Sequence, residues 1–134
     1  MNSHGLIDLH CDTLTDYEYS SGSCPDTLDE PGHVLSLSGL PKDVRWAQFY
    51  AVFIPDEERG QAAIDYFEKN CANFYRQIEK FSERVAPCRN ADDMEQAWAA
   101  GKTAAFLTVE NGSALAGDLS RVHTLAEQGV RAIT

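Results

Sequence analysis

The sequence has few basic residues, no closely spaced pair of cysteines and no apolar run long enough to cross a membrane. Lysine and arginine together number 11 against 21 acidic residues, which gives a net charge of −10. This balance argues against a nucleic-acid partner, because phosphate binding needs a basic surface. The first residues lack the basic region of a secretory signal peptide, and no segment has membrane-spanning length. We therefore expect a cytoplasmic protein that binds neither nucleic acid nor membrane.

The four cysteines have neither a CxxC motif nor zinc-finger spacing. Without an export signal they are expected to be free thiols in a reducing compartment. Cys11 lies within a polar motif described below, but its side chain should point away from its polar neighbours, so a core role is favoured over metal ligation. The cysteines are Cys11, Cys24, Cys71 and Cys88.

Apolar runs alternate with helical segments along most of the chain. Residues 46–54 and 103–109 are apolar on both faces, which is typical of strands covered on both sides in a parallel sheet. Between them, Asp56 is predicted to open a long amphipathic helix, and Asn90 a second helix that runs to Trp98. The long helix could also form a coiled coil, but its apolar stripe covers only about three heptads, so packing on a sheet is preferred. The stripe comprises Ile64, Phe67, Cys71, Phe74, Ile78, Phe81 and Val85.

The rest of the chain continues the pattern. Asp118 is predicted to cap a third helix that ends at Gly129. Residues 130–134 are predicted to start a fourth strand, after a first one near the start of the chain and those at 46–54 and 103–109. Residues 17–42 read as a loop, with a short strand at 33–37. Strand–helix repetition predicts an α/β fold with a parallel sheet. A final strand with nothing after it leaves a sheet edge bare, so we expect residues 1–134 to be one partial domain of a longer protein.

Three polar side chains alternate near the start of the chain, at Asp8, His10 and Asp12. In an extended strand, alternate residues share a face. An imidazole and a carboxylate two positions apart can therefore reach one point, and zinc accepts such mixed nitrogen and oxygen ligands. The alternative is a strand end with a solvated aspartate. Asp8 could orient the His10 imidazole or hydrogen-bond nearby backbone.

Glu110 is the second candidate, because it follows the apolar strand at 103–109. Active sites of parallel α/β proteins lie at the carboxyl ends of the strands. An acidic side chain that leaves a buried strand there needs a cation or a hydrogen-bond donor. The alternative is that Glu110 begins a loop in water.

These motifs resemble the membrane dipeptidase (renal dipeptidase) family of zinc peptidases. The resemblance rests on Asp8-x-His10-x-Asp12 and on Val109-Glu110-Asn111-Gly112. It extends through His33–Leu40, Ala47–Phe53 and Leu125–Thr134, in the order of the family, and so spans the whole chain. The chain departs from the family at Val44-Arg45, where a glycine pair is usual, and at Asn111, where Glu-Gly-Gly is common.

The resemblance implies a (β/α)8 TIM barrel, of which this chain is the N-terminal half, with a two-metal centre that usually holds zinc. His10 and Asp12 would ligate the first metal, and Glu110 would bridge both and thereby act in catalysis. The histidines of the second metal, the substrate-binding residues and the proton shuttle would follow Thr134. The 134 residues alone would thus bind one zinc ion or none.

The implied reaction is hydrolysis of dipeptides, including those with a D-residue at the carboxyl end. Two metals about 3.5–4 Å apart would share a hydroxide that attacks the peptide carbonyl. Two alternatives stay open: another metal-dependent amidohydrolase acting on a non-peptide amide, and a catalytically inert fragment. A bridging Glu argues against the first, since most such enzymes use a modified lysine. Whether the protein forms a homo-oligomer also stays open.

Overall fold

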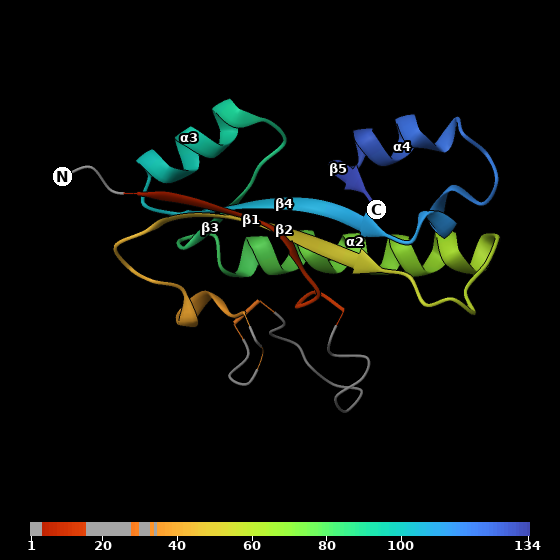
Figure 1. Ribbon diagram of the computed structural model, residues 1–134, viewed down its shortest axis with the longest axis horizontal. Helices are drawn as coiled ribbons and strands as arrows, with labels where there is room; N and C mark the ends of the chain where they lie inside the picture. Colours follow the sequence, from red (N-terminus) through yellow and green to blue (C-terminus); the bar gives the residue numbers. More distant parts are fainter. Residues whose placement is uncertain (1–3, 16–27, 30–32, 34) are drawn as a thin grey trace.

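The computed structural model describes residues 4–15, 28–29, 33 and 35–134, which form one sheet of parallel strands with helices on both faces (Figure 1). The strand order is β1-β2-β4-β3, and β5 also pairs with β4. β3 pairs with the first residues of β4 and β5 with its last, so both lie along the edge of β4 that faces away from β2. The strands are β1 (Gly5–Cys11), β2 (Arg45–Phe53), β3 (Val85–Pro87), β4 (Thr103–Glu110) and β5 (Val130–Ile133).

In the described part of the chain, three α-helices and two short 3-10 helices connect the strands. α2 lies along one face of the sheet, and α3 lies on the opposite side (Figure 1). The helices are α2 (Gln61–Lys80), α3 (Ala91–Ala99) and α4 (Arg121–Glu127), and the 3-10 helices are η1 (Leu37–Gly39) and η2 (Gly112–Leu115).

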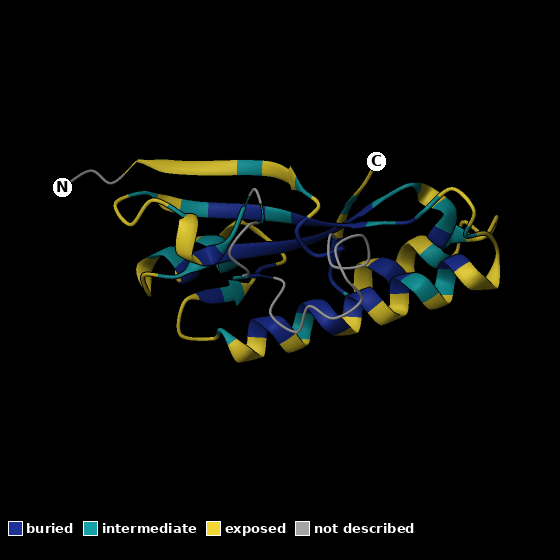
Figure 2. Cartoon of the chain, turned by 90° about the horizontal axis from the view of Figure 1, so that it is seen from below, coloured by how far each residue is buried: buried dark blue, intermediate teal, exposed yellow. Residues whose placement is uncertain are grey.

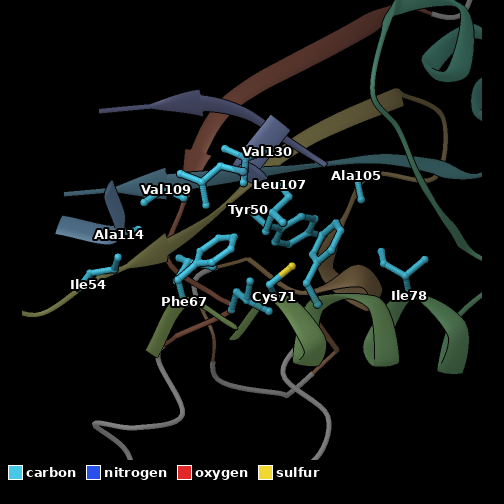
Figure 3. Packing of buried hydrophobic residues seen from close by; sticks show 14 of the residues in the cluster. Tyr50, Ile54, Phe67, Cys71, Ile78, Ala105, Leu107, Val109, Ala114 and Val130 are labelled. Atoms are coloured by element: carbon cyan, nitrogen blue, oxygen red, sulfur yellow. The ribbon is translucent and has the colours of Figure 1, made fainter. Parts of the chain in front are cut away.

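The larger core lies between the sheet and α2. Tyr50 from β2 and Leu107 from β4 pack with Phe67 from α2 (Figure 3). Phe74 from the same helix belongs to this cluster, and all four side chains are almost fully buried. Full burial of a large apolar side chain contributes roughly 1.5–3 kcal/mol. Apolar packing on this face therefore holds α2 against the sheet. The same sheet carries the side chains at the carboxyl ends of its strands.

The smaller core covers the other face near the amino ends of the strands. Alternate residues of β4 point to it, and Phe106 stacks on Phe49 of β2 with ring centroids 4.6 Å apart. Trp98 of α3 packs against this cluster, and its indole N–H donates to the Trp46 carbonyl at 2.9 Å. Since β2 and β4 are covered on both faces, both are buried strands, as their continuous apolar runs predict.

β1 differs from these two strands in its exposure (Figure 2). Leu6, Ile7 and Leu9 expose 42%, 50% and 68% of their surface. β1 pairs only with β2 among the described residues, so its other edge carries unpaired backbone groups there. The strand that presents His10 is thus an edge strand held from one side.

The long helix starts later than predicted. Asp56 was expected to open it, but α2 begins at Gln61 after a turn in which the Glu58 N–H donates to the Pro55 carbonyl. Gly60, with φ +57°, stands immediately before the helix in a left-handed conformation. The carboxylate of Asp56 instead accepts a hydrogen bond from the side-chain amide of Asn111, which follows β4, so a tertiary contact decided its role.

The end of the same helix is also earlier than predicted. α2 ends at Lys80, and Val85 belongs to β3, a short strand that the sequence did not predict. Phe81 and Val85 continue the helical spacing of apolar residues in the sequence. The helix nevertheless ends at Phe81, whose N–H still donates to the Gln77 carbonyl. Three residues are too few for a periodic signal, which is why β3 escaped prediction.

The other boundaries are mixed. α3 is capped by Asn90 as predicted, through a 2.8 Å bond from the Asp93 N–H. For α4 the N-cap is Ser120 rather than Asp118, whose carboxylate accepts from the Ser120 N–H in the preceding turn. The predicted strand at 33–37 is not formed by its described residues, and η1 begins at Leu37. Most of the predicted loop at 17–42, including Cys24, lies outside the described residues.

No helix in the described part of the chain is both long enough and apolar enough to span a bilayer. The described cysteines, Cys11, Cys71 and Cys88, are free. Burial raises the pKa of the Cys71 and Cys88 thiols to about 11, so both are neutral packing groups at ordinary pH.

Candidate metal centre

His10 stands at the carboxyl end of β1, next to a bulge. Asp8 pairs with Gln48 of β2, and Cys11 pairs with Tyr50, so β1 has one more residue than β2 over this stretch. A bulge bends the strand and redirects the side chains beside it. The regular alternation expected from sequence is therefore interrupted at His10, and the local backbone sets its direction.

Asp12 follows β1 directly, in a turn. Its carbonyl accepts a backbone bond of 2.9 Å from Thr15, whose hydroxyl also donates to it at 3.3 Å. Thr13 donates its hydroxyl to the Leu35 carbonyl at 2.9 Å, and both threonines are buried. The backbone of Asp12 is thereby fixed while its carboxylate stays half exposed.

Glu110 is the last residue of β4, two strands away from β1. It pairs with Phe53 at the end of β2, and its carbonyl accepts the Ile54 N–H at 3.1 Å. The strand before it is almost wholly buried, whereas the Glu110 side chain is 37% exposed. The parallel sheet thus carries this carboxylate to the same end as His10.

The three side chains converge. The Nε2 atom of His10 lies 3.0 Å from Glu110 Oε2 and 3.2 Å from Asp12 Oδ1. One ligand atom from each residue lies within 4.8 Å of the other two. Among the described residues, this is the one group of three or more histidine, cysteine or acidic side chains that meets in this way. Residues distant in sequence are therefore brought to one point.

The donor set suits a divalent cation. Two carboxylates approach a single imidazole nitrogen, which can donate at most one hydrogen bond. Among the described residues, no lysine or arginine pairs with Asp12 or Glu110. Zinc bonds of about 2.0–2.2 Å in tetrahedral geometry separate ligand atoms by about 3.3–3.6 Å. The two observed distances are within a few tenths of an ångström of that spacing, so the residues fit zinc with small side-chain adjustments.

Asp8 does not reach the imidazole. Its Oδ1 accepts the backbone N–H of His10 at 3.2 Å, which is the backbone alternative considered from the sequence. The bond closes an Asx-type turn at the bulge and holds the peptide that carries His10. Asp8 therefore acts on the backbone of His10.

Cys11 faces the larger core and not the cluster. Burial, despite a hydrogen bond from Thr13, raises the pKa of its thiol to about 12. A thiol must lose its proton to bind zinc, so the core role expected for Cys11 agrees with its surroundings. His4, His33 and His123 also lie outside the cluster.

Sequence patterns did not identify the residues that hold the backbone after Glu110. Asn111 has φ +74° and uses its side-chain amide to contact the end of β2 and the start of η2. Arg59 donates to the Ser113 hydroxyl at 3.0 Å. An asparagine before glycine at a strand end is a signal for a left-handed turn residue, but nothing local predicts Arg59 or Ser113.

The family model described as "Membrane dipeptidase (Peptidase family M19)" matches residues 1–134. Solved structures match as well. The dipeptidase AC, a metallopeptidase of family M19, has a TM-score of 0.78 at 18% identity over 98% of this chain and 42% of its own. A metallopeptidase from Rhodobacter sphaeroides, liganded with a phosphinate mimic of the dipeptide L-Ala-D-Ala, has a TM-score of 0.78 at 16% identity, with 98% and 45% covered.

A third match is the probable dipeptidase PvdM from Pseudomonas aeruginosa, with a TM-score of 0.73 at 19% identity over 95% of this chain and 33% of that one. At such identities the likeness establishes the fold. The predicted α/β class with parallel strands is confirmed, and the chain corresponds to part of a TIM-barrel-like fold. It spans less than half the length of these structures.

Proposed function

The chain belongs to the membrane dipeptidase family of metallopeptidases, and on that premise we propose that it supplies one part of a two-zinc centre that hydrolyses dipeptides. The observation that carries the proposal is the convergence of His10, Asp12 and Glu110 at the carboxyl ends of β1 and β4. Its setting, at the end of a parallel sheet where such folds place their chemistry, supports the same conclusion.

Each residue has a distinct role. His10 and Asp12 would hold the first metal, and Glu110, which has two oxygens, would contribute to both metals. Asp8 positions the His10 backbone through the bond to its N–H. Bound zinc supplies Lewis acidity toward a carbonyl oxygen and lowers the pKa of a coordinated water.

The chain's own contribution is orientation and charge. The two carboxylates, 51% and 37% exposed, provide negative charge that concentrates a divalent cation at the end of the sheet. The buried β4 keeps Glu110 at a constant distance from β1 through the paired β2. The sheet therefore brings the three side chains to one point.

Dipeptides are the proposed substrate class, including those with a D-residue at the carboxyl end. The family membership supports this class, and the R. sphaeroides relative was solved with a mimic of L-Ala-D-Ala. We also propose that residues 1–134 form one partial domain that binds a single metal without turnover. The coverage of 42–45% of two M19 structures supports this proposal. A cytoplasmic location, a homo-oligomer and the absence of nucleic-acid or membrane partners stay predictions or open questions.

The test measures zinc binding and dipeptide hydrolysis on the 134-residue protein. We expect one Zn²⁺ per chain by calorimetry in the wild type and, in Glu110→Ala, binding too weak for calorimetry to detect. The matched control is Glu57→Ala, which removes an exposed acidic residue at the same end of the sheet, outside the cluster; its affinity should stay within about twofold.

Three outcomes would contradict the proposal. Absence of zinc binding in the wild type would remove the metal centre. Equal binding in Glu110→Ala would remove Glu110 from it. Turnover of L-Ala-D-Ala by the 134 residues alone would show that they hold a complete site, contrary to the single-metal proposal. It would also mean that the chain has more metal ligands than these three.

A further inference from the structure

Asn111, the residue after Glu110, has a backbone conformation that L-residues rarely adopt. Its φ is +74° and its ψ is 105°. Such conformations at non-glycine residues cost on the order of 1–3 kcal/mol and persist only where the surroundings impose them. A glycine would adopt this conformation with little strain. The asparagine side chain must therefore make contacts that offset the strain.

Those contacts use the whole amide. Its Nδ2 donates to the Ile54 carbonyl at 2.8 Å and to Asp56 Oδ1 at 3.2 Å. Its Oδ1 accepts from the Ser113 hydroxyl at 2.7 Å and from the Ser113 N–H at 3.2 Å. Two donors and two acceptor positions are all that a side-chain amide has. We call Ile54, Asp56, Asn111 and Ser113 the Asn111 network.

The peptide between Glu110 and Asn111 is bonded on both sides. The Glu110 carbonyl accepts the Ile54 N–H from the end of β2, at 3.1 Å. The Asn111 N–H donates to the Thr134 carbonyl after β5, at 3.0 Å. The Asn111 network adds a hydrogen bond from the Asn111 side chain to the carbonyl of Ile54, the residue that follows β2. The backbone of Glu110 is thereby held between the two neighbouring strand ends.

The Glu110 carboxylate depends on this backbone for its direction. Among the described residues, the one ion-pair partner of the Glu110 carboxylate is His10, and neither an arginine nor a lysine pairs with it. A long, 37% exposed side chain with a single partner has rotamer freedom. A shift of its backbone would therefore move the ligand oxygen away from His10.

We propose that Asn111 is a positioning residue for Glu110, and that it holds the Glu110 backbone in the orientation that metal ligation requires. This inference rests on the proposed function, because it assigns Asn111 to the metal centre through Glu110. Asn111 touches no metal or substrate itself. Loss of a residue that orients a metal ligand typically lowers metal affinity by 10–100-fold, which sets the expected effect.

The first experiment compares zinc or Co²⁺ affinity in two variants of the 134-residue protein. Asn111→Gly keeps the left-handed backbone accessible and removes the network, and we expect about a tenfold loss of affinity. Ser113→Ala is the matched control, since it removes the hydroxyl's bond to Asn111 Oδ1 and the bond it accepts from Arg59, and leaves the bonds from Asn111 to Ile54 and Asp56. Its affinity should stay within about twofold, and the visible Co²⁺ spectrum should change in Asn111→Gly alone.

A double-mutant cycle separates positioning from general support of the fold. We expect His10 and Asp12 to retain weak Co²⁺ binding in Glu110→Ala, and Asn111→Gly should have no further effect in that background. Equal losses in both backgrounds would overturn the inference, as would wild-type affinity in Asn111→Gly. Absence of metal binding in the wild type would overturn the proposed function and this inference together, so the two failures are distinguishable.

Discussion

The two ends of the sheet differ in how their charged side chains are paired. At the amino end, Arg45 lies 4.9 Å from the ring of Trp98 and 3.7 Å from Glu95. Arg84 pairs with Asp29 there and also contacts an aromatic ring. At the carboxyl end, the one ion-pair partner of Asp12 and Glu110 within the described residues is the imidazole of His10. Arg45 and Arg84 at the amino end are thus matched within the chain, whereas the two carboxylates of the cluster share one imidazole.

The difference separates stability from binding. In barrels of parallel strands, the amino end contributes to stability and the carboxyl end carries the chemistry. Substitutions at the amino end should therefore lower the free energy of unfolding and leave metal affinity unchanged. Substitutions in the cluster should have the opposite pattern.

The largest expected effect is that of Trp98→Ala. The indole packs on the smaller core and bonds the Trp46 carbonyl, and its ring lies 3.2 Å from the position of a Cβ on Gly5. We expect the free energy of unfolding to fall by about 3 kcal/mol. Urea denaturation followed by circular dichroism measures it, and zinc affinity below the transition should match the wild type. A large loss of affinity would show that the two ends are coupled.

His10→Ala should reverse this pattern. Loss of the shared nitrogen should lower zinc affinity at least 100-fold, about 2.7 kcal/mol. The metal-free protein should unfold within about 0.5 kcal/mol of the wild type, because the side chain is 42% exposed. Calorimetry and urea denaturation on one preparation give both numbers. Destabilisation of the metal-free form by more than 1 kcal/mol would mean that His10 supports the fold.

Asp29→Asn tests the paired charges through pH. Burial acts to raise the pKa of Asp29, but hydrogen bonds from Ser38 and Arg84 outweigh it and hold the pKa below its usual value. A carboxylate with a lowered folded-state pKa stabilises the protein above its unfolded-state pKa of about 3.9, and this contribution is lost as the pH falls through the folded-state value. We expect a loss of about 1 kcal/mol at pH 7 that shrinks as the pH falls below about 3.9 toward the folded-state pKa. Denaturation midpoints from pH 3 to 7 measure it; a constant difference would exclude the charge as its origin.

The smallest effect should come from Glu95→Gln. The pair of Glu95 with Arg45 is exposed on both sides, with 61% and 41% of the side chains accessible. Exposed pairs contribute about 0–1 kcal/mol, so we expect a change below about 0.5 kcal/mol in low salt and none in high salt. A larger change would mean that the contact of Arg45 with Trp98 depends on Glu95.

Much of the fold and of the cluster follows from local sequence. The continuous apolar runs of β2 and β4 predict buried parallel strands, and Asn90 and Gly101 mark the ends of α3. The start of α2 could not be predicted from the sequence. Aspartate is a common helix N-cap, but the Asp56 carboxylate accepts a hydrogen bond from Asn111 instead of capping α2. β3 is too short to have a periodicity.

The sequence by itself determined which strands are buried, that the sheet is parallel, and which residue types stand at its carboxyl end. Only the tertiary structure decided that the His10 nitrogen lies 3.0 Å from a Glu110 oxygen, that Asp8 bonds backbone, and that Asn111 joins two strand ends. The physical reason is the distance along the chain over which each kind of interaction acts. Apolar periodicity and caps depend on neighbours within a few residues, whereas the meeting of residues 10 and 110 depends on the register of β2 between them.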